Sequence, residues 1–261
     1  MSDRRRAPLL LLAILAGCAP AQLARHDWIP PGRPEQALLL AQSGLAVFDD
    51  LKAEAKITFR QGRTRNTATA SILYLNPDLF RVDVRGPLYR HLLTLLQRGS
   101  HVTAMAGEET WQGEATGPLL SRLTLFELGE YDLRYALLGL LWSGEVGVGE
   151  VSDLGISSIS YPRADRAIIH LTSASGERLV WLDLQTGFVL REQLRAHGRT
   201  VWTRELADYI ELQTGGGRLY LPRKITFEQG DLGIELEYKN YRVDEGLTAQ
   251  TLEAGVPQPW Q

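Results

Sequence analysis

Residues 76–89 read NPDLFRVDVRGPLY, and both signals that set the fold class occur within this stretch. From Phe80 to Arg85, apolar and charged side chains alternate, which is typical of a β-strand that buries one face and exposes the other. Turn-forming residues stand on both sides, Asn76-Pro77-Asp78 before the strand and Gly86-Pro87 after it. A strand with a turn at each end predicts an antiparallel sheet built from sequential strands.

The same alternation extends in both directions along the chain. Strands separated by turn residues are expected at residues 55–59, 67–75, 80–84, 92–97, 101–105, from 111, and at 156–161, 167–172, 178–184, 188–195, 200–209, 219–227 and 234–243. Strands of this length and spacing favour a meandering antiparallel sheet that curls or closes.

Two parts of the chain have helical spacing instead. Apolar residues from Leu38 to Phe48 recur at helical intervals behind Pro34, which suits an early helical position. A leucine-rich region, residues 117–141, interrupts the strands and predicts a helical insertion. A curved sheet must bury its concave face against something, and this insertion is apolar enough to cover it. The sequence thus predicts a mainly β, α+β fold with one curved antiparallel sheet.

The composition is that of a globular protein. Of the 261 residues, 44% are hydrophobic and 23% are charged, which excludes collagen-like, disordered and multi-span membrane classes. The formal net charge of −3 argues against nucleic acid as a partner. Cys18 is the single cysteine, so the sequence contains no internal disulfide framework.

The N-terminus has the pattern of a secretory signal. Arg4, Arg5 and Arg6 precede an apolar run at residues 7–16, which is shorter than the roughly 20 residues that span a bilayer. The run ends in Leu15-Ala16-Gly17-Cys18, which resembles the lipobox of bacterial lipoproteins. There the Cys18 thiol would receive a diacylglyceryl group, and cleavage before Cys18 would free its amine for acylation. The alternatives for Cys18 are a buried small hydrophobe or a chance cysteine after a plain cleavage site.

These signals divide the chain into four parts. Residues 1–17 are expected to be a lipoprotein signal peptide, and residues 18–34 a lipid-anchored tether, because their prolines discourage regular structure. The alternative for residues 18–34 is an extended arm packed along the domain. Residues 35–257 are expected to form the folded domain, and residues 258–261 a C-terminal tail.

The residues that catalysis needs do not occur at recognisable spacing in the sequence. The five histidines do not pair at metal-ligand spacing, and the sequence contains neither a G-x-S-x-G elbow nor a G-x-x-x-x-G-K-[ST] phosphate loop. The adjacent carboxylates Asp49-Asp50 and Glu108-Glu109 would point apart, which favours solvated charges over an acid–base pair. We therefore expect no enzymatic activity, no cofactor and no metal site.

Three short sequences add to the strand pattern. They are Asn76-Pro77-Asp78-Leu79-Phe80-Arg81-Val82, Trp111-Gln112-Gly113 and Leu221-Pro222-Arg223-Lys224-Ile225. With the order of elements from Gln36 to Pro257, they resemble the LolA/LolB-like lipoprotein-localisation family. The resemblance implies a half-open barrel in which helices cover the mouth of a curved sheet and the concave apolar face takes up acyl chains. The lipobox makes the chain more similar to the anchored, LolB-like acceptor than to the soluble carrier.

Inward-facing strand residues are the candidates for the wall of a lipid cavity: Ile57, Phe59, Phe80, Val82, Val84, Ile225, Phe227, Ile234, Leu236 and Tyr238. Simple core packing predicts the same alternation and is the alternative for each of them. Leu88 and Tyr89 are the candidates for a protruding apolar loop, because the resemblance implies such a loop for passing lipid to the membrane. The alternative is that both side chains fold back on the sheet.

The sequence thus predicts a lipid-anchored periplasmic binding protein that accepts acylated lipoproteins or lipids for outer-membrane delivery. The expected partners are acyl chains, the membrane through the Cys18 lipid, and a soluble periplasmic carrier protein. Ala19, which follows the cysteine, is uncharged. An uncharged residue at this position resembles the pattern of lipoproteins that are delivered by default to the outer membrane. The alternative is an envelope lipoprotein that binds no lipid and acts as a protein-interaction scaffold.

Overall fold

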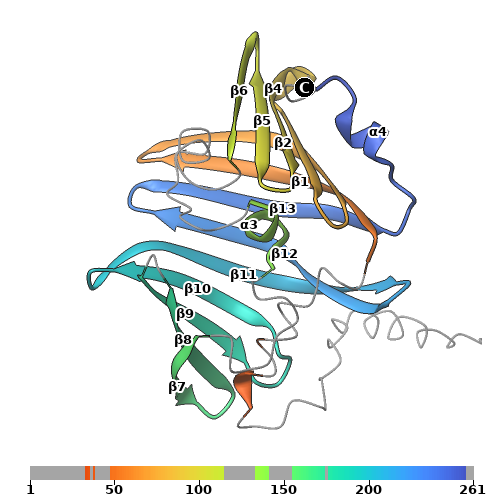
Figure 1. Ribbon diagram of the computed structural model, residues 1–261. Coiled ribbons are helices and arrows are strands. Elements are labelled where there is room, and N and C mark those ends of the chain that lie inside the picture. The colour runs from red at the N-terminus through yellow and green to blue at the C-terminus, as the bar shows by residue number, and fades with distance from the viewer. Residues whose placement is uncertain are drawn as a thin grey trace, which may run out of the picture.

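Thirteen strands form one antiparallel sheet in the computed structural model, which describes residues 33–35, 38, 48–114, 133–140, 155–173 and 176–256. The strands lie where the alternating pattern predicted them (Figure 1). They are β1 (Asp50–Gln61), β2 (Thr64–Leu75), β3 (Leu79–Arg85), β4 (His91–Arg98), β5 (His101–Ala106), β6 (Glu109–Glu114), β7 (Ile156–Arg163), β8 (Arg166–Ser173), β9 (Gly176–Asp183), β10 (Val189–Ala196), β11 (Arg199–Thr214), β12 (Gly217–Gln229) and β13 (Leu232–Val243).

The strand order places both halves of the chain at the centre of the sheet. It runs β6-β5-β4-β3-β2-β1-β13-β12-β11-β10-β9-β8-β7, so β1 pairs with β13. Strands β1 to β6 lead out to one edge, and β7 to β13 return from the other edge. The chain between β6 and β7 includes the short helix α3 (Leu133–Leu138), which lies in front of β12 and β13 (Figure 1).

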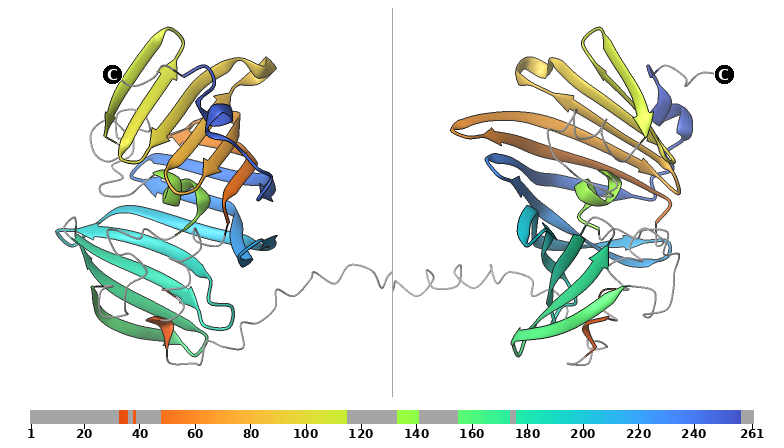
Figure 2. Two further views of the ribbon diagram at one scale, coloured as in Figure 1. Left: turned by 45° about the vertical axis from the view of Figure 1, so that its right-hand side comes forward. Right: turned by 60° about the vertical axis from the view of Figure 1, so that its left-hand side comes forward.

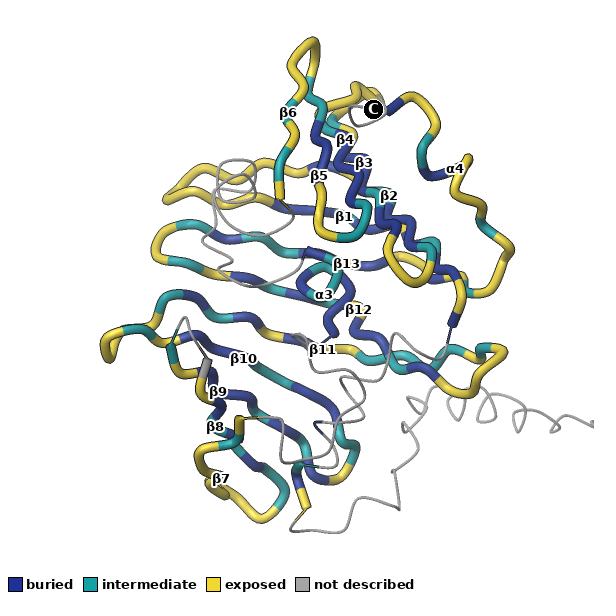
Figure 3. Tube along the Cα trace, in the orientation of Figure 1, coloured by how far each residue is buried: buried dark blue, intermediate teal, exposed yellow. Residues whose placement is uncertain are grey.

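The sheet is strongly curved, and α3 lies on its concave side (Figure 2). Within the described residues the edge strands β6 and β7 do not pair with each other, so the sheet is open. The main core lies on the concave face, where Ala53, Ala55 and Ile57 of β1 are buried while the residues between them reach the other face (Figure 3). This alternation is the one that the sequence predicted.

A second, smaller core lies on the convex face. It packs Leu73, Leu79 and Leu96 against Leu252 and Val256 of the C-terminal segment, which contains the short helix α4 (Ala249–Glu253). Two side chains, Asp50 and Arg81, hold the backbone of this segment by hydrogen bonds. Asp50 accepts hydrogen bonds from the N–H groups of residues 245–247 at 2.7–3.1 Å, and Arg81 donates to the carbonyls of residues 252 and 254 at 2.8 and 2.7 Å.

Several sequence expectations lie largely outside the described residues. Cys18, most of the expected tether, and the tail at residues 258–261 are among them. Of the helix expected behind Pro34, the described residues Pro34, Glu35 and Leu38 are helical, and Leu38 is fully buried. Of the insertion at residues 117–141, the described part is residues 133–140. None of the described helices has both the length and the apolar character that crossing a bilayer requires.

Candidate functional site

A pocket lies between α3 and the centre of the curved sheet. The empty space in it is about 760 Å³, which includes space continuous with open solvent. Every side chain in its wall is aliphatic or aromatic. The wall consists of Ile57, Phe59, Val82, Val84, Leu93, Leu95, Leu133, Ala136, Leu137, Ile225, Phe227, Ile234 and Leu236.

Exposure of the wall shows which end of the pocket is open. Along the inward face of β1, the exposed fraction rises from 0% at Ala55 through 6% at Ile57 to 36% at Phe59. On β13, Leu236 is buried and Ile234 is half-buried. Because Ile57 pairs with Leu236 and Phe59 pairs with Ile234, both strands become exposed toward the same end. The pocket therefore opens at the end of the sheet where the β1–β2 and β12–β13 hairpins turn.

The wall contains eight of the ten residues proposed from the sequence: Ile57, Phe59, Val82, Val84, Ile225, Phe227, Ile234 and Leu236. Phe80 and Tyr238, which we also expected in the wall, lie outside it. Both are buried in the main core, at 0% and 3% exposure. Each is the next residue on the same strand face beyond the wall, on the side away from the opening. Alternation predicted the face of these two residues but not where along the strand the pocket stops.

Five further wall residues were not among the candidates. Leu93 and Leu95 lie on β4, whose sequence Leu92-Leu93-Thr94-Leu95-Leu96 is apolar on both faces because Leu96 packs in the convex core. Leu133, Ala136 and Leu137 lie on one face of α3 at helical spacing. Their place in the leucine-rich insertion indicated contact with the sheet, but no pattern said which face would line a cavity.

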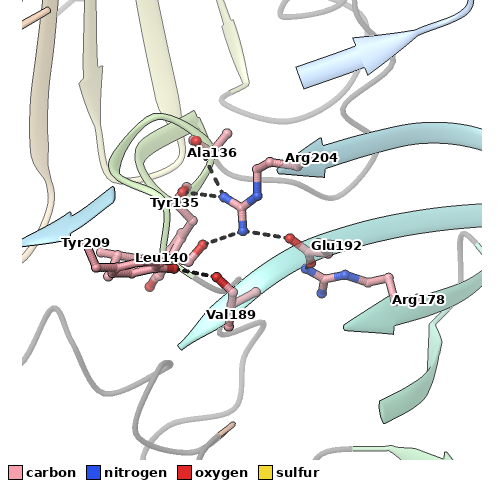
Figure 4. A network of polar contacts seen from close by, with 8 residues as sticks. All are labelled: Tyr135, Ala136, Leu140, Arg178, Val189, Glu192, Arg204 and Tyr209. Atoms are coloured by element: carbon pink, nitrogen blue, oxygen red, sulfur yellow. Dashed lines mark hydrogen bonds and ion pairs between the residues drawn. The ribbon is translucent and has the colours of Figure 1, made fainter. Parts of the chain in front are cut away.

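A buried ion network holds α3 to the sheet (Figure 4). Arg204 of β11 is fully buried and donates to the Tyr135 and Leu140 carbonyls, both at 2.9 Å. Its Nη2 also lies 2.6 Å from Oε2 of Glu192, and Arg178 bonds to the other carboxylate oxygen of Glu192. Arg204 lies two residues from both Trp202 and Leu206, which are buried, so all three side chains lie on the inner face of β11. The network therefore holds α3 within its wall-forming turn, at Tyr135, and just after the helix, at Leu140.

A second contact holds α3 from β13. The Tyr238 hydroxyl donates to the carbonyl of Leu137, and burial raises the pKa of this hydroxyl far above its usual value. Gly139 follows the helix with a φ of +71°, and a Cβ there would lie 2.3 Å from Cγ of Pro222. This close approach requires glycine and seats the end of α3 directly on β12.

Leu88 and Tyr89 form an exposed apolar tip at the open end of the pocket. Their exposed fractions are 97% and 85%, and both have a positive φ, of 57° and 60°. They lie in the 3-10 turn η2 (Pro87–Tyr89), between two strands whose residues Val84 and Leu93 belong to the pocket wall. A leucine in the left-handed region costs about 1–2 kcal/mol, so the turn holds an apolar side chain in water in an unfavourable conformation.

Among the described residues, polar groups that could perform acid–base or metal chemistry do not line this pocket. The described residues contain no group of three or more His, Cys, Asp and Glu side chains that could hold a metal ion. His170 pairs with Glu177 at 2.8 Å on strands that contribute nothing to the wall. What the described wall offers a ligand is therefore apolar contact.

Comparisons with known proteins support the fold. No family model matches the sequence, and no curated protein matches it. Three solved structures resemble the chain: a DUF1329 family protein from Desulfovibrio piger (TM-score 0.60, 13% identity, 87% of this chain and 99% of the other); a domain named for outer membrane lipoprotein sorting from Vibrio parahaemolyticus (0.56, 13%, 84% and 97%); and a LolA superfamily protein from Nitrosomonas europaea (0.51, 12%, 82% and 94%).

These matches cover nearly the whole length of each neighbour. At 12–13% identity they show a shared fold and nothing more specific. The shared architecture is the curved, open antiparallel sheet described above. The protein therefore shares its fold with a LolA superfamily protein and with a domain named for outer membrane lipoprotein sorting.

Proposed function

We propose that the protein is a lipid-anchored, periplasm-facing binding protein that takes up acyl chains of lipoproteins or lipids and delivers them to the outer membrane. It acts by binding and release and carries out no chemistry. The observation that carries this proposal is the pocket, which is open at one end and whose described wall side chains are all apolar. These side chains can bind a hydrocarbon chain but cannot hold a polar substrate by hydrogen bonds.

Affinity for an acyl chain follows from the burial of its methylenes. Each buried CH₂ contributes about 0.8 kcal/mol, so a chain that fills the pocket would bind without any polar contact. The headgroup or attached protein would remain outside, next to the half-buried Ile234 and the partly exposed Phe59. Recognition of the chain alone would suit a carrier whose cargo proteins share a lipid and little else.

Delivery would use the exposed tip at the pocket opening. Leu88 and Tyr89 are positioned to enter the interfacial region of a bilayer while the pocket opening faces it. An acyl chain that leaves the pocket between Val84 and Leu93 would then pass from the apolar pocket wall directly to the apolar side of the bilayer. The Cys18 lipid proposed from the sequence would keep this opening near the outer membrane, and a soluble periplasmic carrier would supply the cargo.

The names of two neighbours are in line with this proposal. One is named for outer membrane lipoprotein sorting and another for the LolA superfamily. Those names describe the neighbours. For this chain they support an envelope location and a lipid ligand as the first hypotheses to test.

The test is uptake of a fluorescent fatty acid by purified protein, followed by mass spectrometry for co-purified lipid. Ile234→Asn should abolish probe binding, because it places an amide in the wall of the pocket. Ile210→Asn is the matched control, since Ile210 is an equally half-buried isoleucine on β11 outside the wall. A folded wild-type protein that binds neither probe nor lipid would refute the proposal and favour the scaffold alternative.

A further inference from the structure

The buried end of the pocket is closed by an aromatic side chain. On β13 the residues Ile234, Leu236 and Tyr238 point to the same face, and the first two belong to the wall. Tyr238 is the next residue inward, is 3% exposed and is not part of the wall. It therefore stands where the empty space ends.

The Tyr238 ring crosses from the sheet to the helix. Its backbone belongs to β13, and its hydroxyl donates to the carbonyl of Leu137, a wall residue on α3. Behind it, the Tyr241 ring stacks at a centroid distance of 4.6 Å, and the Tyr241 hydroxyl donates to the Pro222 carbonyl at 2.6 Å. The ring is thus fixed at both ends and supported from behind, so an entering chain cannot push it aside without breaking these contacts.

We propose that Tyr238 determines the length of acyl chain that the pocket accepts. This inference rests on the proposed function, because it assigns a specificity-determining residue to the same site. An acyl chain entering past Phe59 meets the Ile57 and Leu236 layer and then the Tyr238 ring. Once the end of the chain reaches this ring, any surplus methylenes remain outside the pocket opening, in water.

Binding should therefore depend on chain length in two regimes. While the chain is shorter than the pocket, each added methylene strengthens binding about fourfold, the equivalent of about 0.8 kcal/mol. Once the chain reaches Tyr238, further methylenes add nothing and the affinity reaches a plateau. Removing the ring would extend the pocket by up to one layer of strand residues, about 7 Å, and the plateau would move to longer chains.

The experiment measures displacement of a fluorescent fatty acid by a homologous series of saturated fatty acids, each below its critical micelle concentration. The variants are Tyr238→Leu and Tyr238→Ala, which shorten the side chain to different extents, and Tyr238→Phe, which keeps the ring. Tyr209→Leu is the matched control, because Tyr209 is a tyrosine outside the wall whose hydroxyl donates to the Val189 carbonyl at 2.7 Å. Circular dichroism identifies the variants that fold.

The proposal expects a plateau at longer chains in Tyr238→Leu, with at least a fourfold gain for the first chain beyond the wild-type plateau. The plateau should stay unchanged in Tyr238→Phe and Tyr209→Leu. If Tyr238→Ala does not fold, Tyr238→Leu decides the outcome. An unchanged plateau in Tyr238→Leu, with normal binding of shorter chains, would overturn this inference and leave the proposed function intact. Failure of the wild type to bind any chain would overturn both.

Discussion

Glu192 holds two arginines in the protein interior, and its neutralisation should be strongly destabilising. The carboxylate and Arg204 are both fully buried, and Arg178 is nearly so. In Glu192→Gln the side chain keeps its shape but can no longer neutralise either guanidinium. Breaking a buried ion pair by removing one partner costs about 3–5 kcal/mol, because the remaining charge is left without compensation in a medium of low polarity.

This free energy corresponds to a large change in thermal stability. For a chain of this size, 1 kcal/mol corresponds to about 2–4 °C, so the melting temperature of Glu192→Gln should fall by roughly 6–20 °C. The measurement is thermal unfolding followed by circular dichroism. Glu228→Gln is the control, because Glu228 pairs with Arg60 at 2.5 Å on the surface, where both side chains are about half exposed. That exposed pair contributes at most about 1 kcal/mol.

A comparable loss in the two variants would refute the reasoning, since it would mean that burial adds nothing to the Glu192 network. A further variant separates charge from packing. Replacing Arg178, Glu192 and Arg204 together by methionine or leucine removes all three charges at once, and should cost less than Glu192→Gln alone. The expected gap would disappear if the hydrogen bonds from Arg204 to α3 outweigh the charge effect.

Three further predictions follow from other parts of the molecule. Leu88→Asn should raise the free energy of unfolding, measured by chemical denaturation, by about 1 kcal/mol, because asparagine tolerates a positive φ. The same substitution should slow lipid transfer to vesicles. A loss of stability would contradict the argument that Leu88 is strained. Gly139→Ala should destabilise the protein and weaken probe binding, because the new Cβ collides with Pro222; unchanged melting would show that α3 can shift. Burial raises the pKa of four tyrosine hydroxyls, those of Tyr209, Tyr220, Tyr238 and Tyr241. The folded state therefore keeps protons that the unfolded state loses above about pH 10, so stability should be complete below that pH and fall as the pH rises further. Titration of all nine tyrosines near pH 10 with the fold intact would disprove this.

The sheet could be predicted from the sequence because most strands bury one face only. In β3, Phe80, Val82 and Val84 face the core while Arg81 and Asp83 form an ion pair at 2.8 Å on the other face. Alternation of this kind reports both the strand and its inner side. The turns were equally clear, since Gly86-Pro87 and similar pairs disfavour continuation of a strand.

The pocket could be predicted only in part. Alternation gave the inner side of β1, β12 and β13, but the extent of the empty space depends on which residues α3 covers. Phe80 and Tyr238 were assigned to the wall for this reason, although they lie just beyond it. Leu93 and Leu95 were missed because the convex core also buries the other face of β4. A pattern of period two carries no information on a strand that is apolar on both sides.

The buried charges were missed for a different reason. Arg204 and Glu192 stand among alternating residues, and a charged residue in a strand is ordinarily assigned to the solvent face. Their phase was nevertheless informative, since Arg204 lies two residues from both Trp202 and Leu206, which are buried. A charged residue in phase with large apolar neighbours is a usable signal for an internal ion pair.

The pairing of β1 with β13 has a consequence for the assembly of this molecule. The chain makes β1 early and β13 late, and one wall of the pocket comes from each side of that seam. A partly synthesised chain would expose half of the apolar pocket wall and an unpaired strand edge until almost all of it had been made. The pocket therefore exists only in the complete sheet, and a chain truncated before β13 would expose a strand edge that can pair with other chains and aggregate.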